Sequence, residues 1–191
     1  YNLQPLLVNY DDKLISYPRQ EIIYKSYLNF DNTAHPDTNI AIPFRDLAFP
    51  LFDQNYTSDI LEKLRTAIDW YASSFKTNST KESFLFCAIG MEALLTNGRD
   101  AITKVLSENT AFLIANKDKN SRKHICSQMA KLYSHRSGIA HGGNISTEKI
   151  DLDQLRFYLS SSIKAIIQLI QENTVNSSKD LYQYLEDLKF S

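Results

Sequence analysis

The positions of proline divide this chain into two parts with different options for folding. All five prolines lie within the first 50 of the 191 residues. Average usage would place about seven more in the remainder. Because proline removes a backbone donor and clashes with the preceding turn of a helix, a long stretch without it permits long helices. We therefore expect residues 58–191 to form one helical domain. Residues 1–57 show no sustained apolar period and are expected to be an irregular, proline-containing N-terminal extension or the tail of an upstream domain.

Apolar residues recur at helical spacing throughout the second part. Leu61, Leu64 and Ile68 begin such a stripe, and similar stripes follow along the chain. We expect helices from about residue 58, from Ser79 to about residue 95, over 100–115, from near Ser121 to Gly142-Gly143, from Asp151 over five turns, and over 178–190. Helices with short connections predict an all-α, up-and-down helical bundle of about five to six helices.

The second expected helix is nearly apolar on every side, so it should be central and buried. Ser79 followed by Glu82 is a capping-box pattern at its start. The single charge within residues 84–95 is Glu92. A buried carboxylate needs a partner, and we expect that partner to be Arg136 rather than Arg99.

The overall composition excludes several classes of protein. Apolar residues make up 43% and charged residues 23%, which is ordinary for a globular chain. The longest uncharged apolar run, residues 84–91, is too short to span a membrane. With 21 basic and 22 acidic side chains the net charge is −1, so any attraction to nucleic acid must be local.

The two cysteines, Cys87 and Cys126, lie in apolar helical patterns. We expect both to be buried free thiols in a reducing cytoplasm, and therefore a cytoplasmic protein. Because the chain begins with Tyr1 rather than methionine, we expect it to be a fragment whose targeting signal, if it has one, is hidden.

Arg136 and His141 are the pair of residues best suited to carry chemistry. Arg136 falls on the apolar stripe of its helix, so it must line a cleft, pair with a carboxylate or face a partner subunit. His141 falls where Gly142 and Gly143 should end the helix, and the partial negative charge there favours an imidazolium. Plainer roles stay open, because the arginine could simply hold Glu92 and the histidine could be a helix cap.

A basic segment leads into this pair. Residues 117–136 contain a single acid, Asp118, against six basic side chains: Lys117, Lys119, Arg122, Lys123, Lys131 and Arg136. Such a segment suits a phosphate backbone, although a solvated helix face would look the same.

Other catalytic motifs are missing from the sequence. It has neither a phosphate-binding glycine loop nor a nucleophile elbow. Ser161 and Lys164 match S-x-x-K, but the other motifs of that class do not accompany them. His135 and His141 have no flanking acids, which makes a poor metal site. We therefore expect no metal and no cofactor.

Over roughly residues 58–175 the chain resembles the HEPN superfamily, specifically its Apea-like domains. The resemblance lies in Ala-Ile-Asp-Trp-Tyr at 67–71, in Met-Glu-Ala-Leu-Leu at 91–95, and in Leu132-Tyr133 leading into Arg136-Ser137 and His141-Gly142-Gly143. The last element matches the family's R-x4-6-H motif, with a small polar residue after the arginine. Gly138 inside the motif departs from the pattern and would loosen the helix.

This resemblance implies an all-α bundle that dimerises through the helix carrying Arg136. It also implies metal-independent cleavage of RNA by its own 2′-hydroxyl, in a toxin, abortive-infection or other anti-phage system, with an antitoxin or an upstream sensor domain as a further partner. The catalytic residues would be Arg136 and His141. Supporting residues would be Glu92, Tyr133, His135 and Ser137, and RNA-binding residues would be Lys117, Lys119, Arg122, Lys123 and Lys131. The alternative is a non-catalytic helical module that binds RNA or protein and dimerises.

The spacing of the pair sets a geometric condition. Five residues turn an ideal helix by about 500°, which leaves Arg136 and His141 about 140° apart. They can share a face only if the helix is distorted near Gly138 or ends before His141. A two-fold axis beside the motif would relax this condition, because each residue could pair across the interface.

Overall fold

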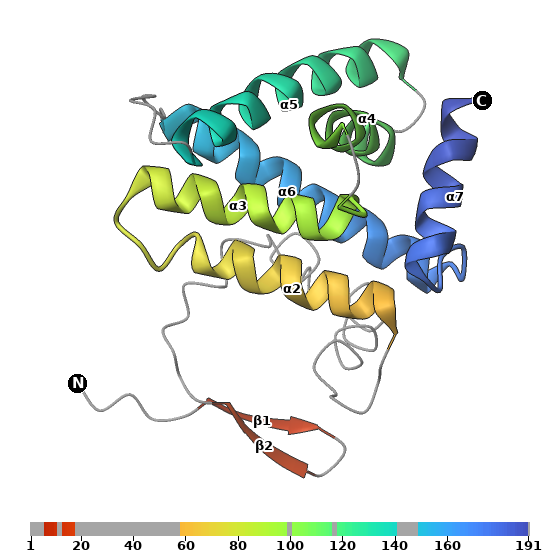
Figure 1. Ribbon diagram of the computed structural model, residues 1–191. Coiled ribbons are helices and arrows are strands. Elements are labelled where there is room, and N and C mark those ends of the chain that lie inside the picture. The colour runs from red at the N-terminus through yellow and green to blue at the C-terminus, as the bar shows by residue number, and fades with distance from the viewer. Residues whose placement is uncertain are drawn as a thin grey trace.

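The structure is a computed structural model in which residues 6–10, 13–17, 58–98, 101–115, 118–140 and 149–190 are described. Beyond residue 57 every regular element of the described part is a helix, which confirms the expected all-α bundle (Figure 1). The helices are α2 (Asp59–Ser73), α3 (Thr80–Leu95), α4 (Ile102–Ile114), α5 (Lys119–Ala140), α6 (Lys149–Gln171) and α7 (Ser178–Lys189).

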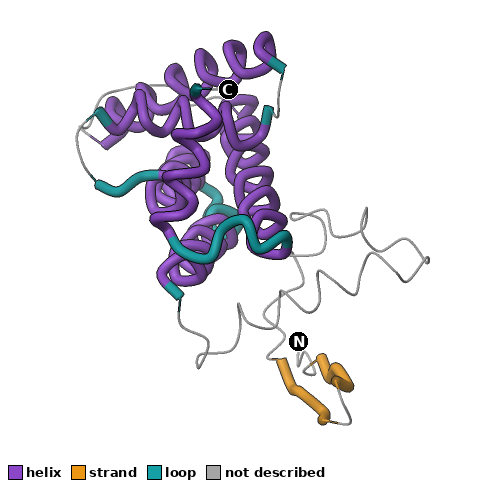
Figure 2. Tube along the Cα trace, turned by 90° about the vertical axis from the view of Figure 1, so that its right-hand side faces the viewer, coloured by secondary structure: helices purple, strands orange, loops and turns teal. Residues whose placement is uncertain are grey.

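The helices are arranged around α3. In Figure 1 the chain runs one way along α2 and α5 and the opposite way along α3 and α6, while α4 is seen nearly end-on and crosses the others. Helix α3 contacts α2, α4, α5 and α6. Short loops join α2 to α3 and α6 to α7, drawn in teal in Figure 2. None of the helices in the described ranges is long and apolar enough to cross a membrane.

The expected central position of α3 is confirmed. Its fully buried side chains include Phe84, Cys87, Met91, Leu94 and Leu95. Gly90 lies at the closest approach of α3 to its neighbours. A Cβ atom at this position would lie 2.9 Å from Cδ2 of Leu159 on α6 and 3.3 Å from the backbone oxygen of Ala67 on α2. Absence of a side chain at Gly90 therefore permits tight packing of three helices.

The N-terminus of α3 is capped by a three-residue arrangement. The Ser79 hydroxyl accepts the backbone N–H of Glu82 over 3.3 Å, as the capping box predicts. The Glu82 carboxylate does not return directly to Ser79. It accepts the Thr77 hydroxyl over 2.5 Å, and Thr77 Oγ1 in turn accepts the backbone N–H of Ser79 over 3.1 Å.

The C-terminus of α3 is held by side chains from three other helices. Lys63 of α2 donates to the carbonyls of Ala93 and Thr96, each over 2.9 Å. The Asn109 amide of α4 donates to the Leu95 carbonyl over 2.9 Å, and the Tyr182 hydroxyl of α7 donates to the Thr96 carbonyl over 2.6 Å. These donors satisfy carbonyls that have no partner within a helix end. Partial burial lowers the pKa of Lys63.

Helix α6 begins at Lys149, two residues before the expected Asp151, and two other helix starts differ from expectation for identifiable reasons. Helix α5 begins at Lys119 rather than Ser121, because the Asp118 carboxylate accepts the backbone N–H groups of Asn120 and Ser121 over 3.1 and 3.0 Å. The single acid of the basic segment is thus a helix cap. Helix α4 begins at Ile102 because Ala101 has a left-handed backbone, with φ 59°.

The N-terminal segment contains an element that the sequence analysis did not predict. Strand β1 (Leu6–Tyr10) pairs antiparallel with β2 (Lys13–Tyr17), with Leu6 opposite Tyr17 and Tyr10 opposite Lys13. The signal was present as two five-residue runs rich in aliphatic and aromatic residues, separated by two aspartates.

The two thiols have different environments. Cys87 is buried as expected, and burial raises its pKa to about 11. Cys126 is only half-buried, so the expectation of two fully buried thiols was wrong for this residue. Partial burial raises its pKa, and the Glu108 carboxylate of α4 raises it further.

Candidate functional site

Arg136 of α5 and Glu92 of α3 form the ion pair that the sequence predicts. Nε of Arg136 lies 2.9 Å from Oε1 of Glu92, and Nη2 donates a hydrogen bond to Oε2 over 3.5 Å. The Nε–H does not point at Oε1 well enough for a second hydrogen bond. The side chains are 31% and 21% exposed, respectively, so the pair lies at the edge of the core rather than inside it. Each partner therefore retains access to solvent or to a ligand.

Tyr133, one turn before Arg136, completes a three-residue cluster. The Arg136 guanidinium carbon lies 5.8 Å from the centroid of the Tyr133 ring. Burial, assisted by a hydrogen bond to the Glu92 carboxylate, raises the pKa of Tyr133 to about 12. The phenol thus stays protonated at neutral pH. Glu92 and Tyr133 together restrict where the guanidinium can point.

His135 faces a residue that the sequence analysis did not single out. Its Nδ1 lies 3.6 Å from Oδ2 of Asp151, in the first turn of α6. This distance is too long for a hydrogen bond, and the contact becomes an ion pair only when the imidazole is protonated. The imidazole also lies beside the Phe84 ring, with centroids 6.5 Å apart. His135 thus links α5 to the beginning of α6 and to the core of α3.

The remaining predicted site residues are distributed around α5. Ser137 is exposed, and the exposed lysines are Lys119, Lys123 and Lys131. Arg122 is half-buried, with its guanidinium carbon 4.5 Å from the centroid of the Phe112 ring on α4. His141 and Lys117 lie outside the described residues, as does Arg99, the other candidate partner of Glu92. The structure thus joins Arg136 to Glu92 and Tyr133 and does not gather the described lysines around them.

The geometry of α5 bears on the spacing condition stated above. The helix runs unbroken through Gly138 to Ala140, so this glycine does not interrupt it. A break of the helix at Gly138 is therefore not what brings the motif residues to one face. The remaining ways are an end of the helix before His141 and pairing across a dimer axis.

The cluster formed by Glu92, Tyr133 and Arg136 carries one negative and one positive charge. Within the described ranges, no three His, Cys, Asp or Glu side chains lie close enough together to hold a metal ion. What the cluster offers is a guanidinium with a defined direction. Such a group can hold a phosphate or a carboxylate through parallel N–H donors.

No protein-family model matches this chain, and neither a curated protein nor a solved structure shows significant similarity to it.

The Glu92–Arg136 pair can be tested by a double-mutant cycle using Glu92→Gln, Arg136→Gln and both together. The partial burial places its coupling energy at about 1–2 kcal/mol, between the values for exposed and fully buried pairs. Urea denaturation provides the four free energies of unfolding. The control is the i,i+4 pair Lys104–Glu108, separated by 3.9 Å, in which the lysine is 74% exposed and Glu108 also lies 3.4 Å from Lys189; its coupling should be below about 0.5 kcal/mol. Coupling near zero for the first pair would show that Glu92 does not hold the arginine.

Proposed function

We propose that this protein is a metal-independent endoribonuclease of the HEPN type, with Arg136 and His141 as its catalytic residues. The observation that carries the proposal is the position of Arg136. Its side chain lies at the edge of the core, is held by Glu92 and remains 31% exposed. A guanidinium that receives a phosphate needs both a fixed direction and an open side, and the pair with Glu92 together with the partial exposure gives Arg136 both.

The proposed reaction uses the nucleophile that RNA itself carries. The 2′-oxygen attacks the adjacent phosphorus while its proton passes to a base, and the bond from phosphorus to the 5′-oxygen breaks. His141 acts in proton transfer, either removing the 2′-hydroxyl proton or protonating the leaving 5′-oxygen. Arg136 stabilises the charge that develops on the phosphate oxygens. The products are a 2′,3′-cyclic phosphate and a 5′-hydroxyl, and DNA, which lacks the 2′-hydroxyl, is not cleaved.

Glu92 takes a definite role in this proposal. While it pairs with Arg136, it competes with phosphate for the same N–H donors. An RNA phosphodiester carries one negative charge, as the carboxylate does, and its two free oxygens can accept the same N–H donors when the bound RNA places them beside the guanidinium. Glu92 is thus a positioning residue that sets the starting direction of Arg136. Tyr133 and His135 maintain the surroundings, while the exposed Ser137 is available to the RNA.

The same resemblance supports a cytoplasmic role in defence or in a toxin system, with an antitoxin or an upstream sensor domain as partner. The second candidate function is a non-catalytic module that binds RNA or protein. The observation that favours it is the existing pair with Glu92, which would also suit a purely structural arginine. Activity measurements on the variants below separate the two functions.

We further propose that the active form is a two-fold homodimer through α5. Helix α5 packs mainly on α4 and much less on α3 and α6, which leaves one of its sides uncovered in the described part of the chain. Multi-angle light scattering at micromolar concentration should give twice the mass of the chain, and Ser137→Arg, on the exposed side of α5, should shift the mass toward the monomer. Lys104→Arg on α4 is the control. A wild-type monomer at this concentration would contradict the proposal.

Cleavage of single-stranded RNA tests the activity. We expect wild type to cut RNA in EDTA, because the reaction needs only the 2′-hydroxyl, an imidazole and a guanidinium. His141→Ala should lower the rate by about 10²–10⁴-fold with nearly unchanged RNA affinity. Arg136→Ala should lower both the rate and the affinity, because the guanidinium contacts phosphate before and during the reaction.

The exposed lysines are expected to act differently. Replacing Lys119 and Lys123 by Gln should weaken binding for all sequences and reduce its dependence on salt, without loss of the rate at saturation. End-group analysis of the products provides the decisive control. A 3′-hydroxyl, or arrest of the reaction by chelation, would overturn the mechanism. Full activity of His141→Ala would favour the binding module or another site.

A further inference from the structure

The seam between α2 and α3 carries an apolar surface that the helices of the described ranges cover only in part. This α2–α3 seam is formed by Trp70 of α2 and by Leu85, Phe86 and Ile89 of α3, all of which are half-buried. We propose that residues 42–52 of this chain dock along the α2–α3 seam and complete the core. The proposal does not depend on ribonuclease activity. It makes part of the N-terminal segment a component of the helical domain.

The α2–α3 seam lies on the helix that most needs to be covered. At about 100° per residue, the side chains of Leu85, Phe86 and Ile89 fall within one sector of about 100° around α3. The large apolar side chains on the other sides of α3 are buried. A helix that is apolar on all sides is normally buried on all sides. The described helices meet this condition for the large apolar residues of α3 except along the seam.

Trp70 of α2 pairs with one residue of this stripe. Its ring lies beside the Phe86 ring, with centroids 5.4 Å apart and planes inclined by 36°. The two helices approach closely here, since a Cβ atom at Gly90 would lie 3.3 Å from Cβ of Trp70. A Phe or Trp side chain can bury about 150–250 Å2 of surface, so covering this pair would add substantially to the core.

A hollow of about 550 Å3 connects the start of α2 with the seam. Its lining residues include Asp59, the first residue of α2, together with Thr66 and Ala93. Thr66 lies one turn before Trp70 on α2, and Ala93 lies one turn after Ile89 on α3, so the hollow and the seam are adjacent. A chain that continues backwards from the first residue of α2 can therefore pass through the hollow to the seam.

Residues 42–52 have the composition that such a surface requires. They read Ile-Pro-Phe-Arg-Asp-Leu-Ala-Phe-Pro-Leu-Phe. The two prolines disfavour a regular helix and favour an extended chain, which suits a narrow seam. Left in water, a segment this rich in apolar side chains would form an exposed apolar patch. The segment and the seam therefore each offer the apolar surface that the other lacks.

The chain is long enough to make this contact. Trp70 lies eleven residues beyond Asp59, which is about 16 Å along α2. Seven residue steps lead from Phe52 to Asp59, and an extended backbone covers up to about 23 Å in seven steps. Covalent attachment also gives the segment an effective concentration in the millimolar range. That advantage favours this segment over a second copy of the chain at micromolar concentration.

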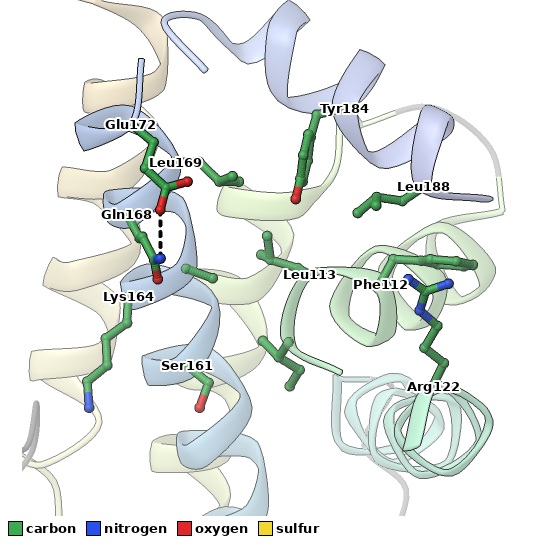
Figure 3. Close-up of a pocket in the computed structure, with 12 residues that line it drawn as sticks. Phe112, Leu113, Arg122, Ser161, Lys164, Gln168, Leu169, Glu172, Tyr184 and Leu188 are labelled. Atoms are coloured by element: carbon green, nitrogen blue, oxygen red, sulfur yellow. Dashed lines mark hydrogen bonds between the residues drawn. The ribbon is translucent and has the colours of Figure 1, made fainter. Parts of the chain in front are cut away.

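The groove between α4, α6 and α7 is a less suitable place for the segment (Figure 3). Phe112 and Tyr184 give it apolar walls, but Arg122, Lys164 and Glu172 also line it. Docking of apolar side chains there would remove water from these charged groups, which costs free energy. The residues of the α2–α3 seam carry no charge, so apolar side chains can cover them without this cost.

Trp70 is the single tryptophan of the chain, so its fluorescence reports directly on the seam. In the wild-type full chain we expect emission from a shielded indole that acrylamide quenches poorly. The triple variant Phe49→Ser, Leu51→Ser, Phe52→Ser should shift the emission to longer wavelength and increase the quenching, because the apolar cover is lost. Unchanged emission and quenching in this variant would overturn the proposal.

The matched control is the triple variant Tyr24→Ser, Leu28→Ser, Phe30→Ser. It removes three large apolar side chains from the N-terminal segment outside residues 42–52. We expect it to leave the emission and the quenching of Trp70 as in wild type. An equal change in both variants would contradict a specific role of residues 42–52. Circular dichroism of both variants shows whether the helices remain intact.

Photo-crosslinking provides a readout that does not depend on the stability of a variant. p-Benzoylphenylalanine replaces Phe49 in the otherwise unchanged full chain, and mass spectrometry identifies the residues attached after illumination. We expect crosslinks within one chain to α2 and α3 at the seam. A crosslinked dimer would show that a second copy covers the seam, and crosslinks to the groove between α4, α6 and α7 would place the segment there. Either result would overturn the proposal.

Discussion

Helix α3 has apolar side chains on nearly every side. The rest of the bundle depends on one constraint, which is that neighbouring helices must shield these side chains from water. Four helices pack against it, and its C-terminal carbonyls are satisfied by Lys63, Asn109 and Tyr182 from three different elements. A buried helix end without such donors would cost the desolvation of several carbonyls. The same donors fix α2, α4 and α7 relative to α3. The helices pack tightly at Gly90, where an added Cβ atom would lie too close to Leu159 of α6.

The candidate site follows from Glu92, the single charged residue within positions 84–95 of this helix. Glu92 cannot be left unpaired at the edge of the core, and Arg136 satisfies it from α5. The contact places a guanidinium on the rim of the bundle with a fixed direction and partial exposure. A stabilising ion pair and a phosphate-receiving group can therefore be the same pair of residues in two states.

Much of the fold could be predicted from the sequence because the relevant signals are local. Apolar spacing predicts the helices, the apolar surroundings of Glu92 predict a partner, and the phase of Arg136 on its stripe identifies that partner. The capping role of Asp118 was also local, but the surrounding lysines favoured an interpretation by charge alone. The hairpin of β1 and β2 is not predicted, because a segment without a helical apolar period favours irregular structure in the sequence analysis.

Features that depend on distant residues could not be predicted. Asp151 faces His135 only because α5 and α6 meet at that end of the bundle, and the sequence offers no sign of that meeting. One groove between α4, α6 and α7 is lined by Phe112, Lys164 and Tyr184. Each of these residues comes from a different helix, and none stands out from the helical apolar pattern of its own segment.

The central claim is that Arg136, held by Glu92 in the free protein, moves to an RNA phosphate on binding. The most direct measurement is an NMR titration of the arginine Nε–Hε signals with a 12-nucleotide RNA whose 2′-O-methyl groups prevent cleavage. The Arg136 signal is assigned from its loss in the variant Arg136→Lys. We predict that this signal shifts at saturation and that its shift in free Glu92→Gln differs from that in free wild type. A signal that stays in place while RNA saturates the protein would contradict the account.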